Sequence, residues 1–310
     1  MWKHGTTKQG KVRWYCKDCK KSGIRKRSDM VERRNIRFVL EWILKGKKLK
    51  HLAEQEKLHL RYVQRIIRGM LQKITVRHHK NILSPDKPLI LDATWIVWRS
   101  LCVLIAHDGE RVIDWMFAPT ENFSVWNLFL SRLEGRPLGI VSDAQKGLLQ
   151  ATALRFGDIP HQRCIAHIAR QCRIWLTRFP KTEAGQELLP LVKMLYRIKN
   201  IEDANSWNIL FDAWLVHHEE FLKEKTSGVG KKWWYTHRKL RGVRSLLVRA
   251  RKDMFAYLEW KLPSTTNHLE GGINGPLKFV FKEHRGLSVD NKKQVVNLFL
   301  SARTREKNQH

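Results

Sequence analysis

Apolar side chains recur every three or four positions between residues 35 and 74, in three short runs separated by turn residues. The runs cover residues 38–44, 49–53 and 60–70. This period predicts three helices. Three short helices with a tight turn before the last one are typical of a helix-turn-helix unit.

The third of these helices would carry a polar face away from its apolar stripe. The members of that face are Arg61, Gln64, Arg65 and Arg68. Side chains of these types contact phosphates and base edges in DNA, so we predict that this helix binds DNA. A plain three-helix bundle with a solvated basic face is the alternative.

Beyond residue 88 the pattern changes to that of strands. Two prolines, Pro85 and Pro88, favour an extended linker over residues 81–88. Three runs rich in Val, Ile and aromatic residues then predict a three-stranded meander. After the meander we expect a helix, a strand and a second helix. The expected strands are 89–97, 101–107, 111–117 and 137–143, and the expected helices are 122–134 and 144–156. The order β-β-β-α-β-α is that of an α/β protein with an RNase H-like core.

Two aspartates occur in these apolar strands, where a charged side chain is unusual. Asp92 lies inside the first strand, between Leu91 and Ala93, and Asp143 ends the fourth strand, which is a neighbour of the first in that fold. An anion inside an apolar strand is costly to bury unless it is paired or binds a metal. Two carboxylates that converge with no cation nearby suit Mg²⁺, which prefers hard oxygen ligands. Two ordinary carboxylates at strand ends are the alternative.

The charge of the chain is strongly positive and unevenly distributed. The 310 residues include 59 Lys+Arg and 29 Asp+Glu, a formal net charge of +30, and residues 1–87 alone carry a net of +18 against −2 for residues 88–160. An excess this large indicates a polyanionic partner and argues against an ordinary enzyme of small metabolites. The 43% hydrophobic content and 13 tryptophans exclude a disordered basic tail.

The cysteines, the apolar runs and the N-terminus add four negative expectations. Cys16 and Cys19 form one Cys-x-x-Cys knuckle of the zinc-ribbon type, but only His4 precedes them as a further candidate ligand, so we expect a zinc-ribbon remnant without zinc. Five irregularly spaced cysteines do not make a disulfide framework. No apolar run is long enough for a membrane span, and no secretory signal is evident. We expect a cytosolic protein that faces nucleic acid.

Two motifs resemble those of a known family. Val141-Ser-Asp143-Ala-Gln-Lys-Gly147 and the following His161-Gln-Arg-Cys164-Ile-Ala-His167-Ile-Ala-Arg170 resemble the second-aspartate region and Cys-x-x-His motif of bacterial Mutator-like insertion-sequence transposases. Far downstream, the segment 264–278 (Ser-Thr-Thr-Asn-His-Leu-Glu-Gly-Gly-Ile-Asn-Gly-Pro-Leu-Lys) resembles the third catalytic block of that family, with Asn267, Glu270 and Asn274 on one helix.

The resemblance implies a DDE transposase in which Asp92, Asp143 and Glu270 hold two Mg²⁺ or Mn²⁺ ions. Asn267 and Asn274 would share the helix face of Glu270 and orient it or contact DNA, and Lys278 nearby would contact DNA. The resemblance also implies a cytoplasmic protein associated with the bacterial nucleoid. Cys164 and His167 would pack or hydrogen-bond near Asp143 and shape the site. Relatives of this kind open with two cysteine pairs, and this chain has only the second, which suggests a start upstream or a truncated copy.

The stretch between Asp143 and Glu270 is about ninety residues longer than a bare RNase H-like core needs, and it resembles the all-helical insertion of the family. Its second half is basic, and its Trp233-Trp234 pair could stack on an unpaired base or belong to the core. The basic residues, for which we expect phosphate contacts, are Lys231, Lys232, Arg238, Lys239, Arg241, Arg244, Arg249, Arg251 and Lys252.

We therefore expect five segments and a DNA transposase that acts as a homodimer or higher oligomer on DNA. A DNA-binding regulator derived from a transposase and a structure-specific nuclease on the same fold are the alternatives. The segments are a zinc-ribbon-like segment (1–30), a helix-turn-helix domain (31–87), the first part of the catalytic core (88–174), the helical insertion (175–262) and the last core helices (263–310).

The charge distribution generates a first prediction. The logarithm of the DNA affinity of the full chain should fall linearly with the logarithm of salt concentration, by about 0.9 per phosphate contact. Changing Arg61, Gln64 or Arg65 to Ala should reduce the ratio of the affinity for DNA that carries the ends of the insertion sequence to the affinity for random DNA. Fluorescence anisotropy measures both affinities. Equal losses of affinity for both DNAs would instead make this helix a phosphate clamp, and an affinity insensitive to salt would refute the prediction.

Overall fold

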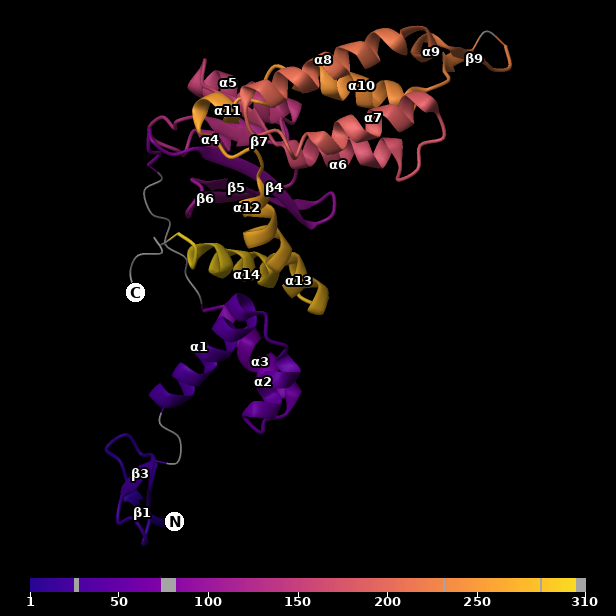
Figure 1. The fold of residues 1–310 in the computed structure, drawn as a ribbon. Coiled ribbons are helices and arrows are strands. Elements are labelled where there is room, and N and C mark those ends of the chain that lie inside the picture. The colour runs from indigo at the N-terminus through magenta and orange to yellow at the C-terminus, as the bar shows by residue number, and fades with distance from the viewer. Residues whose placement is uncertain (25–27, 74–81, 231, 285, 305–310) are drawn as a thin grey trace. The chain divides into compact units, whose positions relative to one another are not determined.

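The computed structural model describes residues 1–24, 28–73, 82–230, 232–284 and 286–304 (Figure 1). The chain divides into two compact units, and each is described by itself. The first comprises residues 1–76 and 277–299, and the second comprises residues 77–276 and 300–310. Within the described residues, no helix combines the length and apolar character needed to cross a membrane.

The first unit begins with a small antiparallel sheet in the order β1-β2-β3. Its strands are β1 (Trp2–Thr6), β2 (Val12–Tyr15) and β3 (Ser22–Ile24), and most of their side chains are exposed. Cys16 and Cys19 follow β2 as free thiols, and a bond to the backbone at Cys19 lowers the pKa of Cys16.

The three predicted helices are present as α1 (Ser28–Lys45), α2 (Leu49–Gln55) and α3 (Leu60–Leu71). Helix α1 begins earlier than the apolar period suggests, because its first turns carry mainly polar residues that give no hydrophobic signal. The apolar side chains meet in one small core, formed by Phe38, Val39, Trp42, Ile43, Leu49, Leu52, Ala53, Val63, Ile67 and Leu71.

Two helices near the C-terminus contribute the rest of this unit. They are α13 (Gly275–Glu283), from Leu277 onward, and α14 (Val289–Ser301), up to Phe299. The ring of His284, which follows α13, meets Trp42 edge-on at 4.8 Å between centroids. This contact joins the two stretches of chain that make up the unit.

The second unit is built on a five-stranded mixed sheet in the order β6-β5-β4-β7-β8. The predicted meander is confirmed as β4 (Leu89–Val97), β5 (Leu101–His107) and β6 (Val112–Ala118), paired antiparallel. Strands β7 (Ile140–Ser142) and β8 (His161–Arg163) are parallel to β4. The sequence pattern missed β8, because His-Gln-Arg gives no hydrophobic signal.

Helices α4 (Phe123–Leu130) and α5 (Lys146–Phe156) cover one face of the sheet, and both were predicted. Leu89, Leu91, Cys102, Leu104 and Ala106 join this core from the strands. The segment expected to be a linker also belongs to it, since Leu83 is buried there and donates its backbone N–H to Glu134 O at 2.8 Å. The extended conformation predicted for 81–88 is interrupted by a turn, in which the Lys87 N–H bonds Ser84 O at 3.3 Å, and Leu83 is packed; residue 81 lies outside the described residues.

The insertion is mainly but not entirely helical, which corrects the prediction of an all-helical segment. Besides its helices it contains a two-stranded antiparallel hairpin of β9 (Lys225–Ser227) and β10 (Trp233–Tyr235). Adjacent aromatic residues such as Trp233-Trp234-Tyr235 favour strands. The helices are α7 (Glu183–Met194), α8 (Ile201–His217), α9 (Glu219–Lys223), α10 (Arg238–Ala250) and α11 (Tyr257–Trp260).

The insertion helices share a large core with α6 (Ile165–Leu176), the helix that follows β8. Trp207 and Phe211 of α8 stack at its centre, 5.0 Å between ring centroids. The side chain of Gln162 in β8 fastens this bundle to the sheet. It is fully buried, donates to Met254 O at 2.8 Å and accepts from the Tyr257 N–H at 2.9 Å.

We expect Gln162→Ala to lower the free energy of unfolding by about 2–6 kcal/mol, because it leaves the Met254 carbonyl and the Tyr257 N–H unpaired at about 1–3 kcal/mol each. Urea denaturation followed by tryptophan fluorescence measures this loss. Gln186→Ala is the matched control, since the Gln186 side chain makes only an exposed bond to Pro180 O. Similar stabilities for the two variants would contradict the role given to Gln162.

Candidate functional site

Asp92 lies in β4, and Asp143 directly follows β7, the parallel neighbour of β4. Leu89 pairs with Ile140 and Ile90 with Val141, and continuing this register sets Asp143 beside Asp92. Neighbouring strands lie about 4.8 Å apart. Because Leu89 and Leu91 face the core under α4 and α5, the strand alternation directs Asp92 to the opposite face of the sheet.

The backbone at Asp143 makes a strained and well-supported turn. Ala144 has a φ of +60°, which is uncommon for a residue other than glycine. Ser142 Oγ accepts from the Ala144 N–H at 3.0 Å, and Asp143 Oδ1 accepts from the Gln145 N–H at 3.0 Å. These bonds fix the position of the Asp143 carboxylate before α5 begins.

Glu270 lies in a helical segment that the sequence predicted as one regular helix. The structure divides it into α12 (Asn267–Leu269), a π-helical turn η1 (Glu270–Asn274) and α13. A π-turn inserts an extra residue per turn and often occurs at functional sites. The wider turn changes which side chains share the face of Glu270.

Asn274 is brought to Asp92 by this turn. Its Nδ2 donates to Asp92 Oδ2 at 2.8 Å, its side chain is buried, and in the described part of the chain its Oδ1 has no hydrogen-bond partner. The expectation that Asn274 orients Glu270 or faces DNA does not match this geometry. Asn267 is exposed, and its backbone N–H bonds Thr265 Oγ1.

Two cationic side chains of α6 hold Glu270. Arg170 donates to Glu270 Oε2, and His167 Nε2 lies 3.4 Å from Glu270 Oε1. Positions 167 and 170 are three residues apart and therefore share one face of α6. His167 also acts electrostatically on Asp92 and Asp143, so a cation does lie near the two aspartates that were expected to converge with no cation nearby.

Cys164 connects three parts of the site. Its backbone N–H bonds Ser142 O at 2.7 Å, and its Sγ accepts from the Thr266 N–H at 3.3 Å and lies 3.4 Å from Thr266 Oγ1. The thiol thus joins the end of β7 to the segment that leads into Glu270. It is the N-cap of α6 rather than a member of that helix.

The electrostatics reflect several acids around one buried carboxylate. Burial raises the pKa of Asp92 to about 7; nearby His167 opposes this rise, and Asp143 and Glu270 add to it. Burial alone would lower the pKa of His167, but a bond to Cys164 and the charges of Cys164, Asp92 and Asp143 raise it to about 9. The negative charges of Asp92 and Asp143 thus favour the protonated, cationic form of His167.

The donor atoms fit a divalent metal ion. Asp92 and Asp143 supply carboxylate oxygens, which hard cations prefer, and the unpartnered Asn274 Oδ1 is a buried acceptor beside Asp92. Glu270 is within electrostatic range of Asp92 but is engaged by Arg170 and His167. In the described part of the chain, only Glu187, His217 and His218 each offer a ligand atom within 4.8 Å of the other two. The carboxylate oxygens of Asp92, Asp143 and Glu270 therefore do not all lie that close together.

The sequence missed three residues at this site. Glu121 is a further carboxylate beside Asp143, and burial raises its pKa. Arg170 donates to Glu270, and Thr266 bonds Cys164. Arg170 and Thr266 lie within the quoted motifs or directly after them, which is a usable signal, whereas nothing in the sequence links Glu121 to the site.

The residues expected to bind DNA are mostly accessible. Arg61, Arg65, Arg68 and Lys278 are exposed, and Gln64 is half-buried. Trp233 and Trp234 are 52% and 41% exposed on β10 and therefore do not belong to the core. Among the basic residues of the insertion, Arg241 packs on Tyr235 and bonds Leu222 O, Arg251 pairs with Asp212, and Lys231 lies outside the described residues.

Fold and site together define an α/β protein with clustered acids on one face of a mixed five-stranded sheet. Residues 89–278 match the sequence model of the Mutator family of transposases. The chain belongs to this family.

Similar proteins include three transposases of insertion elements. The chain is 25% identical over 156 residues to the transposase for IS905 of Lactococcus lactis, covering 46% of this chain and 39% of that protein. It is 29% identical over 122 residues to that for IS1201 of Lactobacillus helveticus (35% and 33%). It is 31% identical over 142 residues to that for ISRM5 of Rhizobium meliloti (41% and 35%). The matches thus span about two-fifths or less of these relatives.

The raised pKa of Asp92 predicts a pH-dependent stability. The unfolded chain releases this proton near pH 4 and the folded metal-free protein keeps it to about 7, so across this window the contribution of Asp92 to stability falls as pH rises. We expect Asp92→Asn to raise the Tm of metal-free protein at pH 8 and to have little effect at pH 4.

Differential scanning fluorimetry in EDTA measures these Tm values. Asp158→Asn, at an exposed acid after α5, should shift the Tm equally little at both pH values. An Asp92→Asn effect that is the same at pH 4 and pH 8 would show that the carboxylate titrates normally.

Proposed function

We propose that this chain is a DDE transposase that binds the ends of an insertion sequence, cleaves the phosphodiester there and joins the freed 3′ end to target DNA. Membership of the Mutator family supports this proposal and implies an RNase H-like core and divalent metal ions. The observation that supports it most directly is the register that sets Asp143 beside the buried Asp92, with Glu270, from a distant part of the chain, within electrostatic range of Asp92.

The acids would hold two Mg²⁺ or Mn²⁺ ions. When bound, such ions activate an attacking oxygen and stabilise a leaving one in phosphodiester chemistry. Asn274 holds the Asp92 carboxylate from one side, and the turn at Asp143 fixes the second acid. Arg170 and His167 set the position of Glu270 and offset negative charge that would otherwise repel the DNA backbone.

The accessible basic and aromatic residues support a role in DNA binding. Arg61, Arg65 and Arg68 lie on one exposed face of α3, suited to phosphates and base edges. Trp233 and Trp234 project from a hairpin, and exposed aromatic rings are platforms for unpaired bases. We propose that α3 reads the end sequence and that the hairpin contacts a distorted or single-stranded region.

Replacing any one of the three acids by Ala should reduce cleavage and strand transfer on the order of 10³-fold or more, because residues that act as a unit are non-additive. The assay uses DNA that carries the inverted repeats flanking the reading frame, with Mg²⁺. DNA binding should persist in each variant, and Ca²⁺ should support binding without cleavage.

Glu202→Ala, at an exposed acid of α8, is the control and should cleave like the unaltered protein. Normal cleavage by Glu270→Ala would show that the third acid is misassigned. Specific binding with no cleavage by the unaltered chain would favour a transposase-derived regulator.

A further inference from the structure

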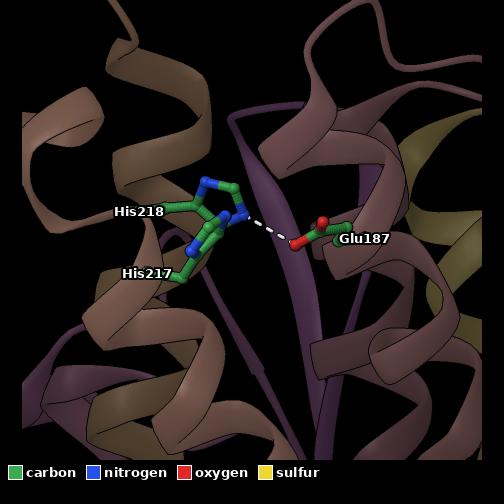
Figure 2. A group of neighbouring side chains, drawn as sticks. All are labelled: Glu187, His217 and His218. Carbon is green, nitrogen blue, oxygen red and sulfur yellow. Dashed lines mark hydrogen bonds and ion pairs between the residues drawn. The ribbon is translucent and has the colours of Figure 1, made fainter.

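A second cluster of potential metal ligands lies in the insertion, apart from the acids discussed above. It consists of Glu187 on α7, His217 at the end of α8 and His218 directly after it, and one ligand atom from each lies within 4.8 Å of the other two. Figure 2 shows the two imidazoles and the carboxylate facing one another from the two helices. No step of the proposed reaction uses them.

The geometry of the cluster is partly fixed before any ion binds. His218 is 5% exposed, its ring packs beside Trp214 at 5.4 Å between centroids, and its Nε2 lies 2.7 Å from Glu187 Oε2. Glu187 and His217 are exposed, so an ion can reach them from solvent. A buried, oriented imidazole beside two accessible donors is suited to capture an ion with a small rearrangement.

The local net charge is negative and favours a cation, although the chain as a whole is strongly positive. Residues 182–222 contain seven acidic and three basic residues, a net of −4 in a chain of net charge +30. Glu219 and Glu220 follow His218 directly. This is the opposite of what DNA contact would require, so this part of the insertion has a different use from its basic second half.

The ligand types indicate which ion. Imidazole nitrogens suit Zn²⁺ and its first-row neighbours, whereas Mg²⁺ and Ca²⁺ prefer oxygen throughout. Two histidines and one glutamate form a known three-ligand set for Zn²⁺, with water as a fourth ligand. We propose that Glu187, His217 and His218 bind one Zn²⁺ ion that clamps α7 to the end of α8.

This site is independent of the expectation that Cys16 and Cys19 hold no zinc. Sequence reasoning had no means to find it, because Glu187 and His218 are 31 positions apart and only the packing of α7 on α8 brings them together. A clamp at this end of the bundle would stabilise the insertion without touching the acids.

Calorimetric titration of metal-free full-length protein with ZnCl₂, in excess Mg²⁺, tests the proposal. We expect one site that weakens at least tenfold in His217→Ala and in Glu187→Gln and that persists in Asp92→Asn. Zn²⁺ should also raise the Tm of the unaltered protein but not of His217→Ala, since only a folded site binds the ion.

His237→Ala is the matched control. His237 and Glu224 form a similar pair at 2.8 Å in the same insertion, and in the described chain that pair belongs to no three-ligand group. His217 is exposed, so circular dichroism of its Ala variant without metal should match that of the unaltered protein. Undiminished zinc binding in both His217→Ala and Glu187→Gln, or equal loss in His237→Ala, would overturn the proposal.

Discussion

The candidate site depends on one buried carboxylate, Asp92, at the centre of the sheet. A carboxylate in such a place is stable only if partners from elsewhere in the chain surround it. Asn274 provides a hydrogen bond from 182 positions away, and the π-helical turn places that amide within reach. The requirement to satisfy Asp92 thus specifies how the Glu270 segment must approach the sheet.

Much of the fold was predictable because it rests on local hydrophobic periodicity. The three N-terminal helices, the meander and helices α4 and α5 all follow from such patterns. Strand β8 and the β9–β10 hairpin were missed, since each is only three residues long and owes its pairing to neighbours rather than to its own pattern. Short strands of this kind are specified by tertiary contacts.

The candidate site was predictable only in part, for a different reason. Resemblance and strand position indicated the three acids, but the partners of those acids depend on which faces of α6 and of the π-helical turn meet. An ideal helix would group Asn267 and Asn274 with Glu270, whereas the inserted residue directs Asn274 to Asp92. Glu121 carries no motif that links it to an acid cluster, so only packing reveals it.

Helix α6 connects the core of the insertion to the residues around Glu270. Its apolar residues Ile165, Ile168, Ala169, Cys172 and Leu176 recur at helical spacing and belong to the core of the insertion. Its other face carries His167 and Arg170, which hold Glu270. One helix thus belongs both to the core of the insertion and to the surroundings of Glu270, so the sequence of α6 is constrained on both faces.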